Sequence, residues 1–520
     1  MRSTFMGLEA SKRGLFTQQS ALYTTGHNIS NANTEGYTRQ RVNMEATLGY
    51  PGSGLNAPTT PGHIGTGVQA HSVQRMRDEF VDRQFRQESN KLGYWESTTK
   101  SISQMEDIMK EPSEFGINQA FTDFWKSMED VIDNPKNSAA RQVLVSKGEA
   151  LAESFTYMDT QLKLIQSNLG NEIRVSTKEI NSILKQIASI NRQIQEVEPN
   201  GYMPNDLYDA RDVLIDQLND YIPVSISTVH SGGNALAIAE GSVTIKFGDI
   251  TLVEGDKYRK MQTQSANNAE ITGENLSDLF SKYGFTELQL ARTHEEAEKT
   301  NTENYAVETM GYNELDAYRG RMTALIDAYG RENATDPTKP IGSYPEMIRY
   351  LDKLVEKFIT EFNAVQSTGF GLDGSTGVNL FDPAGNTAAT MKVVANFDPE
   401  KIAAASVAGE AGNNENIQKL AALNVKSISD LNSGTFQTFY QSLVGDLAVK
   451  GQEAVRMEYN SGTLKLQIEN NRAAMNSVSL DEEMTNMITF QQAYNANARM
   501  ITVIDETLDK IINGLGRVGL

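Results

Sequence analysis

The chain has 520 residues, of which 67 are acidic and 47 basic, giving a formal net charge of −20, and it contains no cysteine. This length exceeds what one hydrophobic core usually organises, so we expect two to four domains. The acidic balance argues against nucleic acid as a partner, because neutralising a phosphate backbone needs concentrated Lys and Arg. The missing cysteines exclude disulfides, thiolate metal sites and a cysteine nucleophile.

Membrane insertion is not expected either, because no run approaches the roughly 20 apolar residues that span a bilayer. Glu9, Lys12 and Arg13 interrupt the N-terminal segment, which therefore does not read as a secretory signal. The mean hydropathy of -0.44 is low for a compact protein and favours an elongated shape.

A narrow apolar stripe predicts a helix of about 25 residues at the N-terminus, suited to one partner helix. Its members recur every seven residues: Leu8, Leu15, Leu22 and Ile29. The stripe stops where Asn28, Asn31 and Gly36 collect, residue types that favour caps and turns.

Helical periodicity then continues as far as Val197 and predicts long packed helices in a bundle or coiled coil. The pattern includes a separate helix face formed by Phe121, Phe124, Trp125 and Met128.

After Pro223 the pattern alternates as in strands, and we expect a β-meander or hairpin from about 222 to 260. Residues 262–310 are polar and poorly patterned, which favours a surface insertion. Helical spacing returns near Met347 and again from about residue 414.

The C-terminal region has the most complete helix pattern. Ser479 and Glu482 have the spacing of a capping box, and Asn513–Gly514 supplies a stop. A stripe spaced by fours and threes lies between them: Leu480, Met484, Met487, Gln491, Tyr494, Ala498, Ile501, Asp505, Leu508 and Ile512. Such a helix would be roughly 50 Å long.

No residues have the spacing of a catalytic or metal site. His294–Glu296 lacks the second histidine of a zinc motif, residues 373–377 lack the bidentate Glu of a calcium loop, and residues 62–67 lack the Lys of a phosphate loop. We therefore expect no enzyme activity, metal or cofactor; the competing hypothesis is an enzyme site within residues 262–346.

A group of carboxylates shares one predicted helix face. Its members are Asp206, Asp209, Asp212 and Asp216, with Arg211 among them. A solvated helix surface is the favoured interpretation, ahead of acid–base catalysis.

These patterns together predict a mainly α fold with a smaller β part, in an elongated multi-domain protein. We expect residues 1–60 to pair with residues 470–520 as a terminal coiled coil, residues 61–222 and 390–469 to form a helical-bundle body, and residues 223–389 to form a mixed α/β central region. A lone amphipathic terminal helix usually packs on a core, but matching stripes at both ends favour a chain folded back on itself.

Several segments resemble proteins of the flagellar rod, hook and hook-associated group. Residues 28–40 resemble the block that follows the first helix in that group, and its motif residues are Asn28, Asn31, Gly36, Tyr37, Arg39 and Gln40. Residues 65–78, 478–484 and 490–498 resemble further blocks. Residues 137–142 and 205–212 resemble the hook-associated protein 1 (FlgK) family in particular.

The resemblance implies a non-enzymatic structural subunit at the junction between the hook and the filament of the bacterial flagellum. It also implies an extracellular protein, exported by the flagellar type III machinery without a cleaved signal. The alternative is another axial protein, a hook or distal-rod subunit. Many family members carry an outer β-domain after the stretch that resembles residues 378–382. Here only a few residues of sequence separate that stretch from residues 391–394, so this domain is expected to be reduced or absent.

The implied partners are further copies of the chain, the hook protein, the second junction protein and an export chaperone at the C-terminal helix. The expected assembly interface comprises Leu8, Leu15, Leu22, Ile29, Leu480, Met484, Met487, Gln491, Tyr494, Ala498, Ile501, Leu508 and Ile512.

Overall fold

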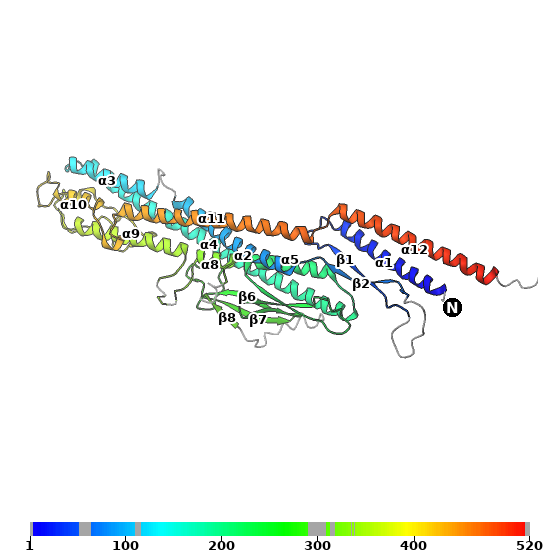
Figure 1. Ribbon diagram of the computed structural model, residues 1–520. Coiled ribbons are helices and arrows are strands. Elements are labelled where there is room, and N and C mark those ends of the chain that lie inside the picture. Colours follow the sequence, from blue (N-terminus) through cyan, green and yellow to red (C-terminus); the bar gives the residue numbers. More distant parts are fainter. Residues whose placement is uncertain are drawn as a thin grey trace, which may run out of the picture.

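The computed structural model describes residues 4–50, 64–109, 116–289, 308–312, 318–333, 335–336 and 339–514. The molecule is elongated, and the helices from the two ends of the chain lie side by side at one end (Figure 1). A helical body with a six-stranded sheet on one side forms the remainder. The mainly α fold with paired terminal helices is confirmed.

The terminal unit consists of two long helices and one hairpin: α1 (Thr4–Ser30), β1 (Gln40–Ala46), β2 (Val68–Arg75) and α12 (Leu480–Gly514). The strands pair antiparallel from Gln40–Arg75 to Ala46–Val68. The predicted domain boundary at residue 60 falls between these two paired strands. Helix α12 begins at Leu480 as predicted, but both Glu482 carboxylate oxygens accept hydrogen bonds from Arg39 instead of closing the predicted capping box.

Four long helices form the body. They are α2 (Glu79–Met109), α4 (Ser138–Val197), α5 (Asn205–Tyr221) and α11 (Phe436–Asn476). The 60 residues of α4 give it a length of roughly 90 Å, and its predicted apolar stripe is largely buried. Helix α11 lies against α2 so closely that a Cβ on Gly451 would be 2.6 Å from Glu106 Oε1.

The tip of the body is held by aromatic side chains from several elements. It contains α3 (Ile117–Asp133), α9 (Ser343–Gln366) and α10 (Glu415–Ala421), whereas α8 (Arg321–Tyr329) packs against α2 and α4 nearer the sheet. The Phe358 ring lies 5.4 Å from that of Phe121 and 5.3 Å from that of Phe436, centroid to centroid. The predicted face around Phe121 and Trp125 is buried in this cluster.

The central sheet is a six-stranded antiparallel meander in sequence order. Its strands are β3 (Ser225–Val229), β4 (Ser242–Phe247), β5 (Ile250–Glu254), β6 (Lys257–Gln264), β7 (Lys282–Gln289) and β8 (Glu308–Gly311). Within the expected surface insertion at 262–310, β7 and most of β8 belong to the sheet, and residues 290–307 lie outside the described residues. Sequence alternation there is weak, and the pairing of β7 with β6 and of β8 with β7 supplies the order. Asn191 on α4 docks the sheet through two hydrogen bonds to the Val243 backbone.

The chain between residues 378 and 394 forms a turn closed at its base. Phe381 and Val393 make an antiparallel bridge, and the Asp382 amide donates to the Lys392 carbonyl over 3.0 Å. Within the described residues, no helix is long and apolar enough to cross a membrane.

Candidate assembly site at the paired chain ends

Helices α1 and α12 pack antiparallel in a single register. A Cβ on Gly7 would lie 3.4 Å from Ile504, and one on Gly14 would lie 2.8 Å from Asn497. Further along, Asn28 contacts Glu483. Each move of seven residues toward the C-terminus of α1 therefore corresponds to a move of seven residues toward the N-terminus of α12, as in an antiparallel coiled coil.

The face of α1 that meets α12 consists largely of small residues. Buried positions on this side include Ser11, Gly14, Ala21, Thr25 and Asn28. Small side chains let the helix backbones approach closely, so α12 can place larger residues against them. The predicted stripe is displaced from this face by one residue. Its members Leu8, Leu15, Leu22 and Ile29 directly follow Gly7, Gly14, Ala21 and Asn28, and they are only partly buried.

The matching face of α12 is also offset in part from the prediction. Its less exposed residues include an unbroken series spaced by fours and threes: Glu483, Met487, Phe490, Tyr494, Asn497, Ile501, Ile504 and Leu508. Met487, Tyr494, Ile501 and Leu508 belong to the predicted seam, and Ala498 is also partly buried. The predicted members Leu480, Met484, Gln491 and Ile512 are exposed instead.

Asn28 connects both helices to the start of the hairpin. Its amide nitrogen donates to the Gln40 carbonyl over 2.9 Å and to Glu483 Oε2 over 3.1 Å. Its amide oxygen accepts from the Gln40 backbone N–H over 3.0 Å and from the Tyr37 hydroxyl over 2.8 Å. One buried side chain thus fixes the end of α1, the start of β1 and the start of α12.

Arg39 clamps the first turn of α12. It bonds Glu482 over 2.8 Å and Glu483 over 2.7 Å, and its backbone N–H donates to the Asn476 carbonyl at the end of α11. Burial lowers the pKa of the Arg39 guanidinium, but the two carboxylates outweigh burial and raise it above its ordinary value. The carboxylates also suit the positive end of the α12 dipole.

The remaining motif residues shape the loop between α1 and β1. Gly36 has φ of +77°, and a Cβ there would lie 2.1 Å from Val213 on α5, so the loop lies tightly on the body. Asn31 follows the last turn of α1, and its side chain donates to the His27 carbonyl within that turn. Gln40 donates to Asp206 over 3.2 Å, again on α5.

Beneath this loop lies a buried network of charges, which we call the ionic joint. Five arginines and five carboxylates from β2, α2, α5, α11 and neighbouring loops form it: Arg75, Arg77, Arg86, Arg211, Arg472, Asp82, Asp209, Asp212, Asp216 and Glu240. Arg75 bonds Asp209 over 2.7 Å and Asp212 over 2.9 Å. Arg472 bonds Asp82 over 2.7 Å and Asp216 over 2.8 Å.

In the ionic joint, opposite charges offset the cost of burying each charged group. Burial raises the pKa of the Glu240 carboxyl, but Arg75 and Arg211 outweigh burial and hold that pKa below its ordinary value. Burial lowers the pKa of Arg211 to about 10, so its guanidinium stays charged at neutral pH. Each charge therefore depends on partners that lie far from it in the sequence.

The structure corrects the interpretation of the carboxylates on α5 as a solvated surface for Asp209, Asp212 and Asp216, whereas the Asp206 side chain is exposed. Asp209 and Arg211 are buried, and the Asp209 carboxylate also accepts from the Thr38 backbone N–H over 3.0 Å. Arg75 and Glu483 lie in blocks that carry the family resemblance, but sequence reasoning did not predict their ion pairs, and it missed Arg472 altogether. Their partners are separated from them by long stretches of chain, so no local spacing marks them.

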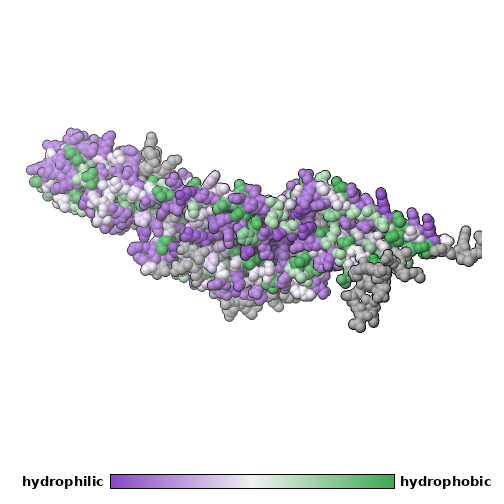
Figure 2. All heavy atoms as spheres, in the orientation of Figure 1, coloured by the Kyte–Doolittle hydropathy of each residue, from purple (hydrophilic) through white to green (hydrophobic). Residues whose placement is uncertain are grey.

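Outside the contact between α1 and α12, the terminal unit exposes many large apolar side chains. These are Phe5, Phe16, Tyr23, Leu480, Met484, Ile488, Met500, Val503, Ile511 and Ile512. Figure 2 shows hydrophobic residues on the visible face of this end of the molecule. Apolar residues gathered on a projecting helix pair favour contact with another protein surface.

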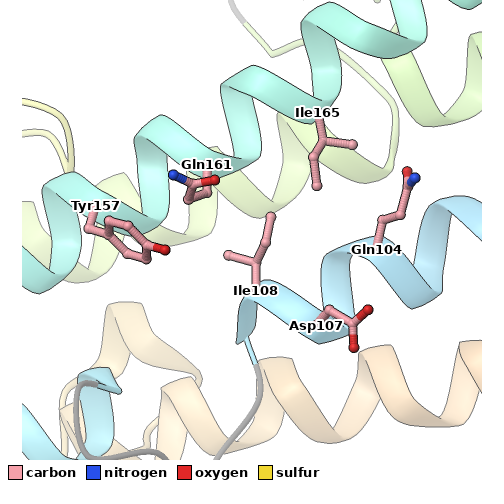
Figure 3. A pocket seen from close by; sticks show the side chains of 6 residues that line it. All are labelled: Gln104, Asp107, Ile108, Tyr157, Gln161 and Ile165. Carbon is pink, nitrogen blue, oxygen red and sulfur yellow. The ribbon is translucent and has the colours of Figure 1, made fainter.

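The hollows in the body offer no comparable chemistry. One of about 300 Å³ lies between α2 and α4, where Ile108 and Ile165 approach each other beside Tyr157 (Figure 3). Its one carboxylate is Asp107. Within the described residues, no group of three or more His, Cys, Asp or Glu could hold a metal ion. The rejected zinc motif, His294–Glu296, and residues 62 and 63 of the rejected phosphate motif lie outside the described residues.

Comparison with known proteins gives consistent matches. Residues 102–381 match the family model described as the flagellar hook-associated protein FlgK helical domain. Residues 8–38 match that of flagella basal body rod proteins, and residues 474–514 match the C-terminal model of the basal body rod FlgEFG proteins.

The relatives that align with nearly the whole chain share the same protein name. The chain is 40% identical to flagellar hook-associated protein 1 of Bacillus subtilis, with 99% of each chain covered. It is 27% identical to the Escherichia coli protein of that name, with 96% of this chain and 98% of that one covered. The flagellar hook junction protein FlgK of Burkholderia pseudomallei shares the fold, with a TM-score of 0.60 and 12% identity over 76% of this chain and all of that one.

Proposed function

The chain belongs to the flagellar hook-associated protein 1 (FlgK) family, and we propose that it joins the hook to the filament by assembling through its terminal unit. Its role is structural and not enzymatic. The observation that carries the proposal is the outer surface of the α1–α12 pair, where apolar side chains such as Ile488 and Val503 are more than half exposed. Such surfaces become stable when neighbouring helices cover them.

The alternative of a hook or distal-rod subunit is less well supported. The rod-protein models match only residues 8–38 and 474–514, the two ends. The FlgK helical-domain model matches more than half of the chain between them.

The neighbours in the assembly are further copies of this chain, with the hook protein and the second junction protein on either side. The chain reaches this place outside the cell through the flagellar export machinery. A chaperone covers the C-terminal helix during export, and the exposed Met484 and Met500 suit it because methionine side chains adapt to varied surfaces.

A deletion of residues 480–512 tests this proposal. It removes α12 but leaves α11 and its Arg472 in place, so the body should stay folded while the labelled protein disappears from hook tips and motility is lost. Label in a short zone at the hook tip is expected for the intact protein. Label along the whole hook, or normal motility of the deletion strain, contradicts the proposal.

A further inference from the structure

Exposed methionine side chains gather in and beside the terminal unit. Within the part of the chain that the structure describes, they are Met484 and Met500 on α12, Met44 on β1 and Met475 in the last turn of α11. Methionines of the body, such as Met105 on α2, are buried in its core. The thioethers that solvent reaches most easily therefore lie at or near the surface that we assign to assembly.

These thioethers are the side chains that peroxide oxidises most readily in this protein, because the chain contains no cysteine thiol. We propose that the three methionines of α12, Met484, Met487 and Met500, form an oxidation-sensitive modification site, and that their conversion to methionine sulfoxide blocks assembly. The effect on assembly rests on the proposed function of the terminal unit. The site does not require α1 and α12 to be paired in the free chain, because unfolding of α12 exposes all three thioethers.

The oxidation needs no other group of the protein. The thioether sulfur attacks one oxygen of hydrogen peroxide, so that an S–O bond forms and the O–O bond breaks. Sulfur loses two electrons, and the departing hydroxide takes the proton of the transferred oxygen and leaves as water. The product is a polar, chiral sulfoxide, which methionine sulfoxide reductases convert back to the thioether.

Each of the three methionines lies among apolar contacts. Met484 and Ile488 are four residues apart, and Met500 and Val503 are three apart, so each pair shares an exposed patch of the helix. Met487 lies on the side of α12 that meets α1. When a neighbouring helix covers any of these positions, a sulfoxide oxygen loses water without gaining a partner, which should weaken binding about tenfold per residue.

The body should withstand the same oxidant. Met105, Met128 and Met322 are buried on α2, α3 and α8, so peroxide reaches them only when the body opens. Met44 and Met475 are exposed but lie outside α12, and they supply a matched control.

Binding of the full-length chain to purified hooks, measured before and after treatment with hydrogen peroxide, tests the inference. Mass spectrometry should find sulfoxide on the three α12 methionines well before it appears on Met105. The treated chain should bind hooks at least tenfold more weakly. Methionine sulfoxide reductases of both epimer specificities should then restore binding.

Two variants locate the effect. A chain with Met484→Leu, Met487→Leu and Met500→Leu should bind hooks equally well with and without peroxide, because leucine has a similar volume and is not oxidised. The control chain, with Met44→Leu and Met475→Leu, should stay as sensitive to peroxide as the unaltered chain.

Unchanged binding of the oxidised chain, full sensitivity of the triple leucine variant, or resistance of the control variant would each overturn the inference. If the triple variant binds poorly before treatment, the reductases still test the unaltered chain, because a loss of binding that they do not reverse overturns the inference. An untreated chain that fails to bind hooks contradicts the proposed function, whereas binding that survives oxidation contradicts this inference alone.

Discussion

Asn28 and Glu483 are 455 residues apart in the sequence, yet their side chains share a buried hydrogen bond of 3.1 Å. The contact lies where the two ends of the chain leave the body, and Arg39 bonds the same carboxylate. It connects the two terminal helices at the end of their contact that lies next to the body.

Replacing Glu483 with Gln should destabilise the terminal unit by about 1–3 kcal/mol, because Arg39 loses a buried charged partner. Far-UV circular dichroism during denaturation measures it. Glu482→Gln is the matched control: Glu482 is exposed, so its loss should cost less than about 1 kcal/mol. Equal losses in the two variants would contradict a special role for Glu483.

Replacing Arg75 with Met should destabilise the protein by about 3–5 kcal/mol, because Asp209 and Asp212 are left buried without their partner. Arg13→Met breaks an exposed pair with Glu9 and should change the free energy of unfolding by less than about 1 kcal/mol. Chemical denaturation of both variants measures the difference. A neutral Arg75→Met would show that the joint does not hold the hairpin.

Alanine at two glycines of α1 should have unlike effects. At Gly26 a Cβ meets no atom within 4 Å, so Gly26→Ala should stabilise the helix by about 0.5–1 kcal/mol. At Gly14 the Cβ would lie 2.8 Å from Asn497, so Gly14→Ala should gain less or lose stability. Thermal unfolding compares them, and equal gains would argue against a close contact of α1 with α12.

Acid should weaken the joint through Glu240. Its folded pKa is lower than the ordinary 4.5, because Arg75 outweighs burial. A depressed carboxyl pKa contributes stability above the ordinary value, and this is lost as pH falls through the folded value. The free energy of unfolding should thus fall with pH below about 4.5, and less steeply in Glu240→Gln. Parallel pH profiles of the two proteins would exclude this contribution.

The terminal helices could be predicted from the sequence, but not the face by which they meet. Leu8 and Leu15 attract attention because they are apolar, whereas Gly7 and Gly14 contact α12 because they are small. Small residues carry little hydropathy signal, and apolar residues on α12 line both the contact and the exposed side.

The ionic joint could not be predicted, for a different reason. Asp209 and Asp212 on α5 are three residues apart, the spacing of an ordinary solvated face. Asp209 is instead buried against Arg75, which lies 134 residues away, and Arg211 is buried beside Glu240. The motif of residues 28–40 indicated the family from the sequence, and its structural role became visible once α5 and α12 were placed beside it.

The central claim is that the exposed side of the terminal pair carries assembly, and incorporation of point variants onto purified hooks tests it most directly. Ile488→Asp and Val503→Asp alter residues that are 55% and 51% exposed, so the free chain should keep its fold. Val425→Asp, at a position 76% exposed in the body, is the control. We predict that the two α12 variants fail to bind hook tips while the control binds normally. Normal binding of both α12 variants would contradict the account.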